Sequence, residues 1–574
     1  MDYIEKAKFW SENTCFDIET QKEAKKLLKD KNRDLCKDSF GSILEFGTGG
    51  LRGIMGVGTN RVNRYTIQTA TEGVARIIMK NNFGPDSRKE VIIGYDTRHR
   101  SLEFAKVASE VLAGHEIPVF LFAEPSPTPL VSCELLRRNA AAGIIITASH
   151  NPPEYNGYKV YWKNGGQIVP PLEGQIINQI RNLKRIDEIP VIPFEKALKD
   201  MKIEWIHKDA DEYYLNTVSN LSLGNSENNK KLGVVFTPLH GTGGRLVPEL
   251  LKRNCFERVK TIEEQMIPDG EFSTLSSPNP EDVGAFNMAV SQASDKDDLI
   301  LANDPDADRL GVMIRDSEKK WRWLTGNQIG VLILDYILSN LSKKKLLPIN
   351  GVIFTTVVTS PLVSKMAEEY GLKVVEVLTG FKWIRQAALK YEKDHDYKFV
   401  FGMEESHGYL MGNHSGDKDG IWASLVFAEM VASHKVNNLT ALDRLNQIYQ
   451  HHGTYLDVLE TRTFSGTKGI EKIQQLMKNL RDSPPETVAG NSVVQITDFL
   501  HNTITFTDKA SPAMIGPGLP PSNVISIELE DSTRIIARPS GTEPKIKYYF
   551  NLCGEDSLIL EKKLDAIQQD FLRD

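Results

Sequence analysis

The sequence predicts a mixed α/β protein in which three similar α/β domains precede a smaller α+β domain. Short buried strands alternate with helix-like stretches over most of the chain, and this alternation is typical of doubly wound parallel sheets. After about residue 450 the pattern changes. Apolar and charged residues alternate over 525–530, a turn follows at Asp531, and a return strand begins at Arg534. This pattern predicts an antiparallel hairpin, and therefore a different kind of domain.

The individual elements follow in order along the chain. Residues 1–40 alternate charged and apolar positions, as amphipathic helices do. Ser101 is a candidate N-cap for a helix over 101–114, and a helix begins near Thr128. The apolar run 329–341 is short and contains a charge, so it predicts a buried helix, and 555–574 predicts a terminal helix. Strands are predicted at 91–98, 119–122, 140–146, 234–237, 299–302, 352–356 and 399–403.

Length and composition limit the class of protein. The 574 residues are too many for one hydrophobic core, and 40% hydrophobic with 25% charged residues is an ordinary globular composition. We predict four domains, at 1–205, 206–322, 323–450 and 451–574. The net charge of −7 argues against nucleic acid or an anionic membrane as the main partner, but local basic residues can still bind an anionic small substrate.

The location of the protein is predicted from segments that the sequence lacks. The first residues do not show the basic and then apolar pattern of a signal peptide. No apolar run approaches the roughly 20 residues of a membrane-spanning helix. The five cysteines are scattered and form no C-x-x-C pair. These features predict reduced thiols and a cytoplasmic protein.

A serine loop follows the buried strand at 140–146. The sequence T-A-S-H-N-P at 147–152 cannot continue a helix or a central strand, so it presents Ser149 at the end of a strand, where α/β proteins bind ligands. Lys159 lies ten residues later in an alternating segment. A serine on a rigid loop with a lysine nearby suggests a nucleophile or phosphate carrier. The alternative is ordinary turn chemistry, in which the side chains bond the local backbone.

Three aspartates follow the predicted strand at 299–302. Asp304, Asp306 and Asp308 repel one another unless a cation neutralises them, and oxygen-only ligands favour a hard ion such as Mg²⁺. An EF-hand is excluded because its sixth position, here Arg309, requires glycine. The alternative to metal binding is a solvated acidic turn.

Two other segments have the composition of phosphate-binding loops. Glycines surround Arg52 at 47–58, although the spacing fits neither a dinucleotide fingerprint nor a P-loop. The segment 538–547 gathers Arg538, Ser540, Gly541, Thr542 and lysines. In both places a simple tight turn is the alternative.

A carboxylate and a hydroxyl follow the strand at 399–403. Glu404 and Ser406 point to the same side if this segment is extended, so they could bind neighbouring sugar hydroxyls, and Lys418 adds a cation nearby. A charged surface loop is the alternative here.

These motifs together resemble the α-D-phosphohexomutase superfamily, the phosphoglucomutases and phosphomannomutases. T-A-S-H-N-P, D-P-D-A-D-R at 304–309, E-x-S at 404–406 and R-P-S-G-T-E-P at 538–544 occur in the order of that family. The resemblance covers about Phe46 to Phe550. It implies four domains around a central cleft, three of them similar mixed α/β units and the last a smaller α+β domain. The chain length and the E-E-S-x-G form look most like the long phosphoglucomutase subgroup.

The resemblance also implies roles for single residues. Ser149 is the phosphoserine of the active enzyme, and Mg²⁺ is bound by the phosphoserine and by Asp304, Asp306 and Asp308. Lys159 is the expected general acid/base, with His150 and Lys418 as alternatives. Arg52 is also an implied catalytic residue, and with His150, Lys159 and Arg309 it surrounds the transferring phosphoryl group. The implied substrate-binding residues are Arg309, Lys418, the residues Thr379, Gly380 and Lys382 in a substrate loop, Glu404 and Ser406 at the sugar hydroxyls, and Arg538, Ser540, Gly541 and Thr542 at the second phosphate.

The implied activity is the interconversion of glucose 1-phosphate and glucose 6-phosphate, with glucose 1,6-bisphosphate as intermediate and activator. The implied partners are small sugar phosphates, with no nucleic acid and no membrane, and the implied assembly is a monomer or weak homodimer. Some relatives that use both mannose and glucose carry a histidine two positions after the sugar-binding serine, where this chain has Gly408, and this difference favours glucose. Phosphomannomutase or phosphopentomutase activity stays an alternative, as do a metal-dependent phosphatase and a non-catalytic sugar-phosphate-binding protein. A serine hydrolase is disfavoured because Ser149 lacks the G-x-S-x-G elbow.

Overall fold

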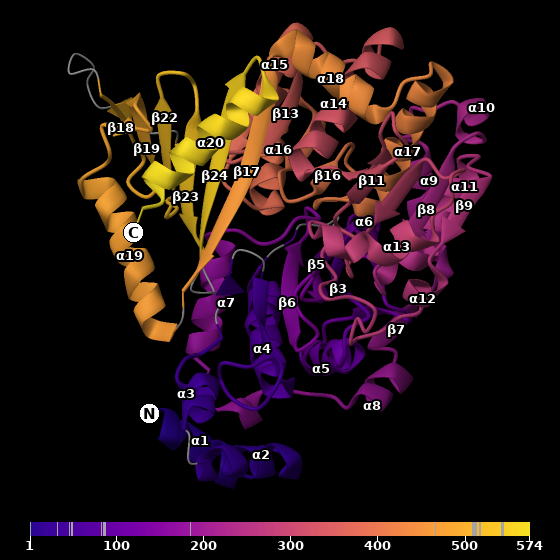
Figure 1. Cartoon of the computed structure of the whole chain (residues 1–574). Helices are drawn as coiled ribbons and strands as arrows, with labels where there is room; N and C mark the ends of the chain where they lie inside the picture. The colour runs from indigo at the N-terminus through magenta and orange to yellow at the C-terminus, as the bar shows by residue number, and fades with distance from the viewer. Residues whose placement is uncertain are drawn as a thin grey trace. The chain divides into compact units, whose positions relative to one another are not determined.

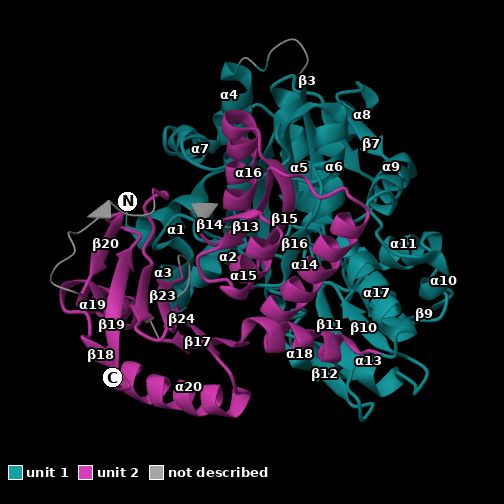
Figure 2. Cartoon of the chain, turned by 90° about the horizontal axis from the view of Figure 1, so that it is seen from above, with its two compact units in different colours: residues 1–326, 406–438 teal, residues 327–405, 439–574 magenta. Residues whose placement is uncertain are grey.

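The structure is a computed structural model of the whole chain (Figure 1). It describes all residues except 1, 31–32, 45, 48–49, 82, 84–87, 184, 465, 508–513, 516–517, 541–544 and 574, and the side chains of 46–47, 466–468 and 514–515 are also not described. The described residues form two compact units (Figure 2). Unit 1 contains residues 1–326 and 406–438, and unit 2 contains residues 327–405 and 439–574.

Unit 1 begins with helices that pack around an aromatic cluster. The Trp10 ring stacks on Phe16 with a centroid distance of 4.4 Å and makes edge contacts with Phe40 and Tyr65. Buried aromatic area of this kind attaches the first helices to the helix that carries Tyr65. The helices lie where the pattern of residues 1–40 predicts them, at α1 (Tyr3–Glu12), α2 (Ile18–Lys29) and α3 (Asp34–Phe40), and Tyr65 belongs to α4 (Arg64–Lys80).

The first sheet of unit 1 is mixed, with the strand order β1-β2-β6-β5-β3-β4-β7. The parallel layer expected from the strand–helix alternation is present in β5, β3, β4 and β7, whereas β6 runs antiparallel to β5. The short connection at 147–154 explains the difference, because parallel neighbours need a crossover of a dozen or more residues. The strands are β1 (Phe46–Gly47), β2 (Gly50–Ile54), β3 (Arg88–Tyr95), β4 (Val119–Phe122), β5 (Ala140–Ile146), β6 (Tyr155–Trp162) and β7 (Ile203–Ile206).

The helices around this sheet include one start that differs from the prediction. Ser101 is the first residue of its helix and not the N-cap; the cap position is Arg100, with a φ of 63°. The Ser101 hydroxyl instead donates to the buried Asp96 carboxylate over 2.7 Å, so it cannot cap the helix. These helices are α5 (Ser101–Gly114), α6 (Thr128–Arg138), α7 (Leu172–Arg181), η1 (Ile186–Glu188), α8 (Phe194–Lys199) and α9 (Lys208–Ser219).

The second sheet of unit 1 has the order β12-β11-β10-β8-β9. β8, β9 and β10 are parallel, and β11 and β12 are antiparallel additions. The elements are α10 (Ser226–Asn229), β8 (Gly233–Thr237), η2 (Thr242–Arg245), α11 (Val247–Arg253), β9 (Arg258–Thr261), α12 (Glu263–Met266), η3 (Val283–Phe286), α13 (Asn287–Gln292), β10 (Leu299–Ala302), β11 (Gly311–Arg315) and β12 (Trp321–Trp323). Residues 406–438 add β16 (Gly408–Leu410) and α17 (Gly420–Val436) to unit 1.

Unit 2 contains a parallel layer and an antiparallel sheet. In the parallel layer β13 (Gly351–Thr356) lies between β14 (Lys373–Val377) and β15 (Lys398–Glu404). The apolar run 329–341 belongs to a helix whose Ile333 and Ile337 are fully buried, which confirms its prediction as a buried helix. The helices are α14 (Gly326–Lys343), α15 (Leu362–Glu369), α16 (Phe381–His395) and α18 (Ala441–His452).

The last part of unit 2 is an antiparallel sheet with the order β17-β24-β23-β22-β19-β20-β21, and β18 pairs with β19. The predicted hairpin is confirmed, because Glu528 pairs with Arg534 across neighbouring strands. The elements are β17 (Thr454–Thr463), α19 (Gly466–Asp482), β18 (Thr487–Val488), β19 (Asn491–Asp498), β20 (Thr503–Phe506), β21 (Met514–Ile515), β22 (Ile525–Leu529), β23 (Arg534–Pro539), β24 (Lys545–Gly554) and α20 (Ser557–Phe571). A smaller α+β domain thus ends the chain, while the predicted boundaries of the four domains stay a prediction.

No helix among the described residues is long and apolar enough to cross a membrane. All five cysteines are free thiols.

The helix α17 is held in unit 1 by a buried carboxylate, which gives a test of the fold. Glu429 is 1% exposed and accepts hydrogen bonds from the backbone N–H groups of Leu223 and Gly224, each over 3.0 Å. We expect Glu429→Ala to destabilise unit 1 by about 2–4 kcal/mol, because those N–H groups lose their acceptor. Differential scanning calorimetry measures the effect. In the control Glu227→Ala, which removes an exposed pair with Lys230, the change should stay within about 0.5 kcal/mol. Equal unfolding curves for the two variants would contradict this account.

Candidate active site

The serine loop lies at the carboxyl end of β5. Ser149 is 1% exposed and has a left-handed backbone with φ of 53°, which is uncommon for a residue other than glycine. Its hydroxyl donates to Asp304 Oδ2 over 2.6 Å, and His150 Nδ1 lies 3.3 Å from the same hydroxyl oxygen. Unit 1 therefore places the predicted carrier serine in direct contact with the predicted metal loop.

An arginine that sequence reasoning did not select holds this loop. The Arg98 guanidinium is buried, and its Nε lies 3.3 Å from Asp96 Oδ2. It donates to four backbone carbonyls of the loop, at Ser149 (2.6 Å), Pro152 (2.7 Å), Tyr155 (3.1 Å) and Asn151. A single side chain thereby holds the backbone of the loop from Ser149 to Tyr155.

The acidic trio, defined as Asp304, Asp306 and Asp308, is buried in the loop after β10, with 0–1% of each residue exposed. One ligand oxygen from each carboxylate can be chosen so that all lie within 4.8 Å of one another. Burial and then the charges of Asp306 and Asp308 raise the pKa of Asp304 well above its usual range. This shift expresses the cost of gathering negative charge away from water.

The trio fits a hard divalent cation. Asp306 Oδ1 and Asp308 Oδ1 are buried and have no hydrogen-bond partner among the described residues. Buried carboxylate oxygens without a donor are costly, and a cation is the partner that would satisfy both. Because all the available ligands are oxygens, Mg²⁺ matches this donor set.

Two lysines neutralise part of the acidic trio. Lys159, on β6 and 1% exposed, places its Nζ 2.7 Å from Asp306 Oδ2 and 3.4 Å from Asp308 Oδ2. Lys418 Nζ lies 2.8 Å from Asp308 Oδ2. Burial opposes ionisation of Asp306, but Lys159 and a hydrogen bond with Asp304 hold the pKa of Asp306 well below its usual range. Lys159, the predicted general acid/base, and Lys418, its predicted alternative, therefore both contact the acidic trio.

Two arginines lie at the edge of this cluster. Arg52 is on β2, where it pairs with Gly157, and its Nη1 lies 3.4 Å from Asn151 Oδ1. Its buried Nε has no hydrogen-bond partner among the residues described. Arg309 donates its backbone N–H to Asp304 Oδ1 over 3.0 Å and forms an ion pair with Glu281. Both can supply positive charge to a phosphoryl group near Ser149.

The predicted sugar-binding residues are only partly brought together. In unit 2 the backbone N–H of Gly380 donates to Glu404 Oε1 over 2.7 Å, so the 378–382 loop meets the end of β15. Thr379 precedes this glycine, and Lys382 is buried in the first turn of α16. The prediction of an extended segment through Ser406 is wrong. β15 ends at Glu404, and residues 405–407 form a turn with a left-handed His407 at φ of 64°.

That turn has a physical cause within unit 1. The His407 ring bonds the carbonyl of Leu310 over 3.0 Å, and the backbone N–H of Leu310 donates to the carbonyl of His407 over 3.1 Å. These two hydrogen bonds hold the chain in a turn just after Ser406. An extended strand could not form both of them.

The predicted phosphate loop is partly described. Arg538 lies on β23 with its Nη1 3.4 Å from the Tyr549 hydroxyl, and the Ser540 backbone N–H donates to the Lys545 carbonyl over 2.8 Å. Gly541 and Thr542 lie outside the described residues. Burial raises the pKa of Glu405, while the charges of Arg538 and Lys547 oppose the shift. Within unit 2, the Glu405 carboxyl group therefore interacts with the positive charges of Arg538 and Lys547.

Sequence reasoning missed three residues of these sites. Arg98 and Glu405 stand beside predicted motifs, and polar residues directly after a buried strand were the available signal for Arg98. Asp417 lies 3.6 Å from Lys418 Nζ and accepts a hydrogen bond from the Tyr161 hydroxyl over 2.7 Å. Its position next to Lys418 was the available signal, but one acidic residue before a lysine is too common to be specific.

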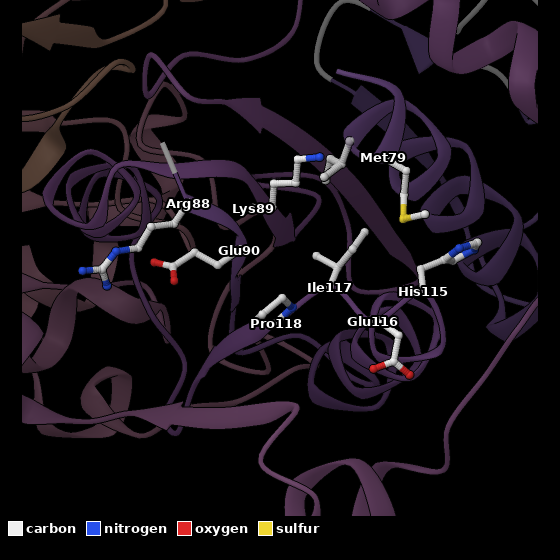
Figure 3. A pocket seen from close by; sticks show the side chains of 9 residues that line it. Met79, Arg88, Lys89, Glu90, His115, Glu116, Ile117 and Pro118 are labelled. Atoms are coloured by element: carbon white, nitrogen blue, oxygen red, sulfur yellow. The ribbon is translucent and has the colours of Figure 1, made fainter. Parts of the chain in front are cut away.

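A cavity of about 280 Å³ at the opposite end of the first sheet is separate from the serine loop. It is lined by residues that precede or begin β3 and β4, among them Lys89, Glu90 and His115 (Figure 3). Figure 3 shows Glu90 turned toward Arg88 and away from His115. The side chains that line this cavity carry charges of both signs, so the cavity does not favour an anion.

Comparisons with known proteins agree with this geometry. Residues 44–187, 212–318 and 325–451 match the domains described as phosphoglucomutase/phosphomannomutase alpha/beta/alpha domains I, II and III. A phosphoglucomutase of Staphylococcus aureus is 37% identical over 535 residues, which cover 92% of this chain and 93% of that protein.

Solved structures agree at the level of the fold. Parafusin from Paramecium, a phosphoglucomutase, has a TM-score of 0.67 with 20% identity and covers 92% of this chain and 95% of its own. A phosphoglucomutase/phosphomannomutase family protein from Burkholderia thailandensis has a TM-score of 0.65 with 18% identity, over 93% and 97% of the two chains.

The three matched domains and the curated relative identify a phosphoryl-transfer enzyme. The chain belongs to the phosphoglucomutase/phosphomannomutase family of the α-D-phosphohexomutase superfamily, which confirms the resemblance inferred from the motifs. It is therefore an isomerase that transfers phosphate within its substrate.

The contacts of Arg98 predict a positioning role. We expect Arg98→Lys to lower kcat by about 100-fold, because an ammonium cannot reach all the loop carbonyls and the Ser149 hydroxyl shifts. The KM for sugar phosphate should change much less. Steady-state kinetics, with circular dichroism to check folding, measure both. The control is Arg100→Lys, at an exposed arginine paired with Glu103, and it should retain activity. An unchanged kcat in folded Arg98→Lys would disprove the role.

Proposed function

We propose that this enzyme interconverts glucose 1-phosphate and glucose 6-phosphate through a phosphoserine at Ser149. The observation that carries the proposal is the 2.6 Å hydrogen bond from the Ser149 hydroxyl to Asp304, within a buried trio of carboxylates. A serine in this place can carry a phosphoryl group, whose negative charge then requires the cations that surround it.

The proposed reaction consists of two transfers. In the first, the bond between Ser149 Oγ and phosphorus breaks while O6 of glucose 1-phosphate forms a new bond to phosphorus. Glucose 1,6-bisphosphate results, and it also serves as the activator that phosphorylates a dephosphorylated enzyme. In the second transfer, the phosphoryl group on O1 moves to Ser149 Oγ and glucose 6-phosphate is released. Both transfers need neutralised charge and a group that moves the hydroxyl proton.

The acidic trio is proposed to bind Mg²⁺ together with a phosphoserine oxygen. Bound Mg²⁺ would neutralise charge on the phosphoryl oxygens. Arg52 and Arg309 add positive charge from the protein at the edge of the same cluster. Lys159 is the proposed proton carrier, because its amino group is buried beside the trio and close to the Ser149 loop. His150 and Lys418 are the alternatives.

Substrate recognition is proposed for residues of the other motifs. Glu404 and Ser406 bind the sugar hydroxyls, with the substrate loop beside them. The contact between Gly380 and Glu404 supports this assignment for the part that lies in unit 2. The residues proposed for the loop are Thr379, Gly380 and Lys382, and those proposed for the second phosphate are Arg538, Ser540, Gly541 and Thr542.

Glucose is the proposed sugar. The Staphylococcus aureus relatives are named phosphoglucomutases, and Gly408 occupies the position where some relatives that use both mannose and glucose carry histidine. Mannose and pentose phosphates remain the alternative substrates. A cytoplasmic location and a monomeric or weakly dimeric state stay predictions from the sequence.

The phosphoserine is tested by Ser149→Ala. Coupled turnover of glucose 1-phosphate, with Mg²⁺ and a trace of glucose 1,6-bisphosphate, should fall by at least about a thousandfold because the covalent carrier is lost. The control Ser273→Ala, at an exposed serine, should turn over normally. Parallel assays with mannose 1-phosphate and ribose 1-phosphate rank the sugars as substrates. Release of inorganic phosphate without isomerisation would instead identify a phosphatase, and no turnover of any sugar with intact Mg²⁺ binding would leave a binding protein.

The cation site is tested by Asp306→Asn. Loss of one carboxylate charge should raise the Mg²⁺ concentration for half-maximal activity by about tenfold or more, because the amide is a weaker ligand for a hard cation. Chelation of the ion should abolish wild-type activity, and added Mg²⁺ should restore it. Asp316→Asn, at an exposed turn, is the control. A Mg²⁺ titration that is the same for both variants would rule out Asp306 as a ligand.

A further inference from the structure

A second group of metal-binding side chains lies in unit 2. Two histidines, His451 and His452, end helix α18, and Glu369 ends helix α15. His451 Nε2 lies 2.5 Å from Glu369 Oε1, and His452 Nε2 lies 3.8 Å from Glu369 Oε2. One ligand atom from each of the three residues lies within 4.8 Å of the others. Neither the mutase reaction nor the sugar-phosphate motifs use these residues.

We propose that His451, His452 and Glu369 form a binding site for a divalent transition metal ion of the Zn²⁺ class. Two imidazoles and one carboxylate are a common protein ligand set for zinc, and water can fill the remaining position. Imidazole nitrogen suits Zn²⁺, Cu²⁺ and Ni²⁺, whereas Mg²⁺ prefers oxygen. The site therefore differs in chemistry from the oxygen-only acidic trio.

The histidine geometry supports coordination. The two rings lie nearly perpendicular, at 79°, with centroids 4.6 Å apart, so they can direct nitrogens to one point without stacking. The His452 side chain is 11% exposed, and its ring makes no hydrogen bond with another residue in the described part of the chain.

A simple surface ion pair is the competing interpretation, and the same unit contains one for comparison. His501 Nδ1 lies 2.5 Å from Asp498 Oδ2, as close as His451 is to Glu369. That carboxylate is shared with Arg481, and no second histidine joins the pair. A guanidinium at this carboxylate repels a metal cation, whereas His452 offers a third ligand to the proposed site.

The place of the site in the fold gives the ion a structural effect. Helix α18 ends at His452, and strand β17 begins at Thr454 after Gly453, whose φ is 94°. β17 pairs with β24 over its whole length. A bound ion would tie the end of α15 to the segment that leads from α18 into the antiparallel sheet. Metal binding should therefore stabilise unit 2, since a ligand that binds only the folded state adds to stability.

Calorimetric titration of the full-length protein with ZnCl₂ tests the site. Excess Mg²⁺ is present throughout, so that the acidic trio is already exposed to its own ion. We expect binding of one Zn²⁺ that weakens about tenfold or more in each of His451→Gln, His452→Gln and Glu369→Gln. The matched control His501→Gln should bind as the wild type does. Co²⁺ in place of Zn²⁺ should give the visible absorption of a nitrogen-ligated ion in the wild type and lose it in the His451 and His452 variants.

Each other outcome overturns the proposal. Absence of Zn²⁺ binding in the wild type would leave His451 and Glu369 as an ion pair only. Equal Zn²⁺ affinity in all variants would place the ion elsewhere. His451 is mostly exposed, so His451→Gln is not expected to impair folding, and circular dichroism checks this. Because the readout is binding and not turnover, the result does not depend on the proposed glucose phosphate activity.

Discussion

The burial of three carboxylates in one loop is the constraint on which the active site of unit 1 depends. Like charges this close are tolerated away from water only when opposite charges and hydrogen-bond donors meet them. Lys159 arrives from β6 of the first sheet, Lys418 arrives from the segment before α17, and the Ser149 hydroxyl arrives from the end of β5. Segments far apart in the sequence therefore meet at one group of negative charges. Two carboxylate oxygens of this group have no donor among the described residues, and a cation would satisfy both.

The serine is held at this cluster by backbone geometry that the loop alone would not favour. A left-handed residue other than glycine costs about 1–3 kcal/mol and persists only when its surroundings fix it. Arg98 fixes it, because its guanidinium donates hydrogen bonds to the carbonyl of Ser149 and to carbonyls of the residues that follow. The Asp96 carboxylate in turn meets Arg98 and the Ser101 hydroxyl. The contacts of Arg98 and Asp96 therefore hold the Ser149 loop in one conformation, as the pre-organisation of a functional group requires.

The sequence was sufficient to predict which side chains carry the chemistry of the site. It was not sufficient to predict the contacts that hold those side chains in place. Residues at the carboxyl ends of strands could be selected because parallel layers collect them at one edge, and this principle placed Ser149 and the acidic trio together. Arg98 was missed because no local pattern states which carbonyls a guanidinium will meet. The turn through Ser406 and the capping of α5 were mispredicted for a similar reason. In each case a tertiary partner, Leu310 for His407 and Asp96 for Ser101, decided the local conformation.

The acidic trio and the group of His451, His452 and Glu369 differ in the kind of atom that they offer to a metal ion. Most N, O or S sites bind Zn²⁺ more tightly than Mg²⁺, so carboxylates alone do not exclude a transition metal; geometry, ligand type and abundance decide which ion is bound. In the acidic trio, Lys159 and Lys418 contact Asp306 Oδ2 and Asp308 Oδ2, and the Oδ1 atoms of both residues have no hydrogen-bond donor among the described residues. In unit 2, His451 and His452 offer imidazole nitrogens, which Mg²⁺ does not prefer as ligands. The two groups therefore differ in the donor atoms that they offer to a metal ion, oxygens alone in the acidic trio and two imidazole nitrogens with one carboxylate in unit 2.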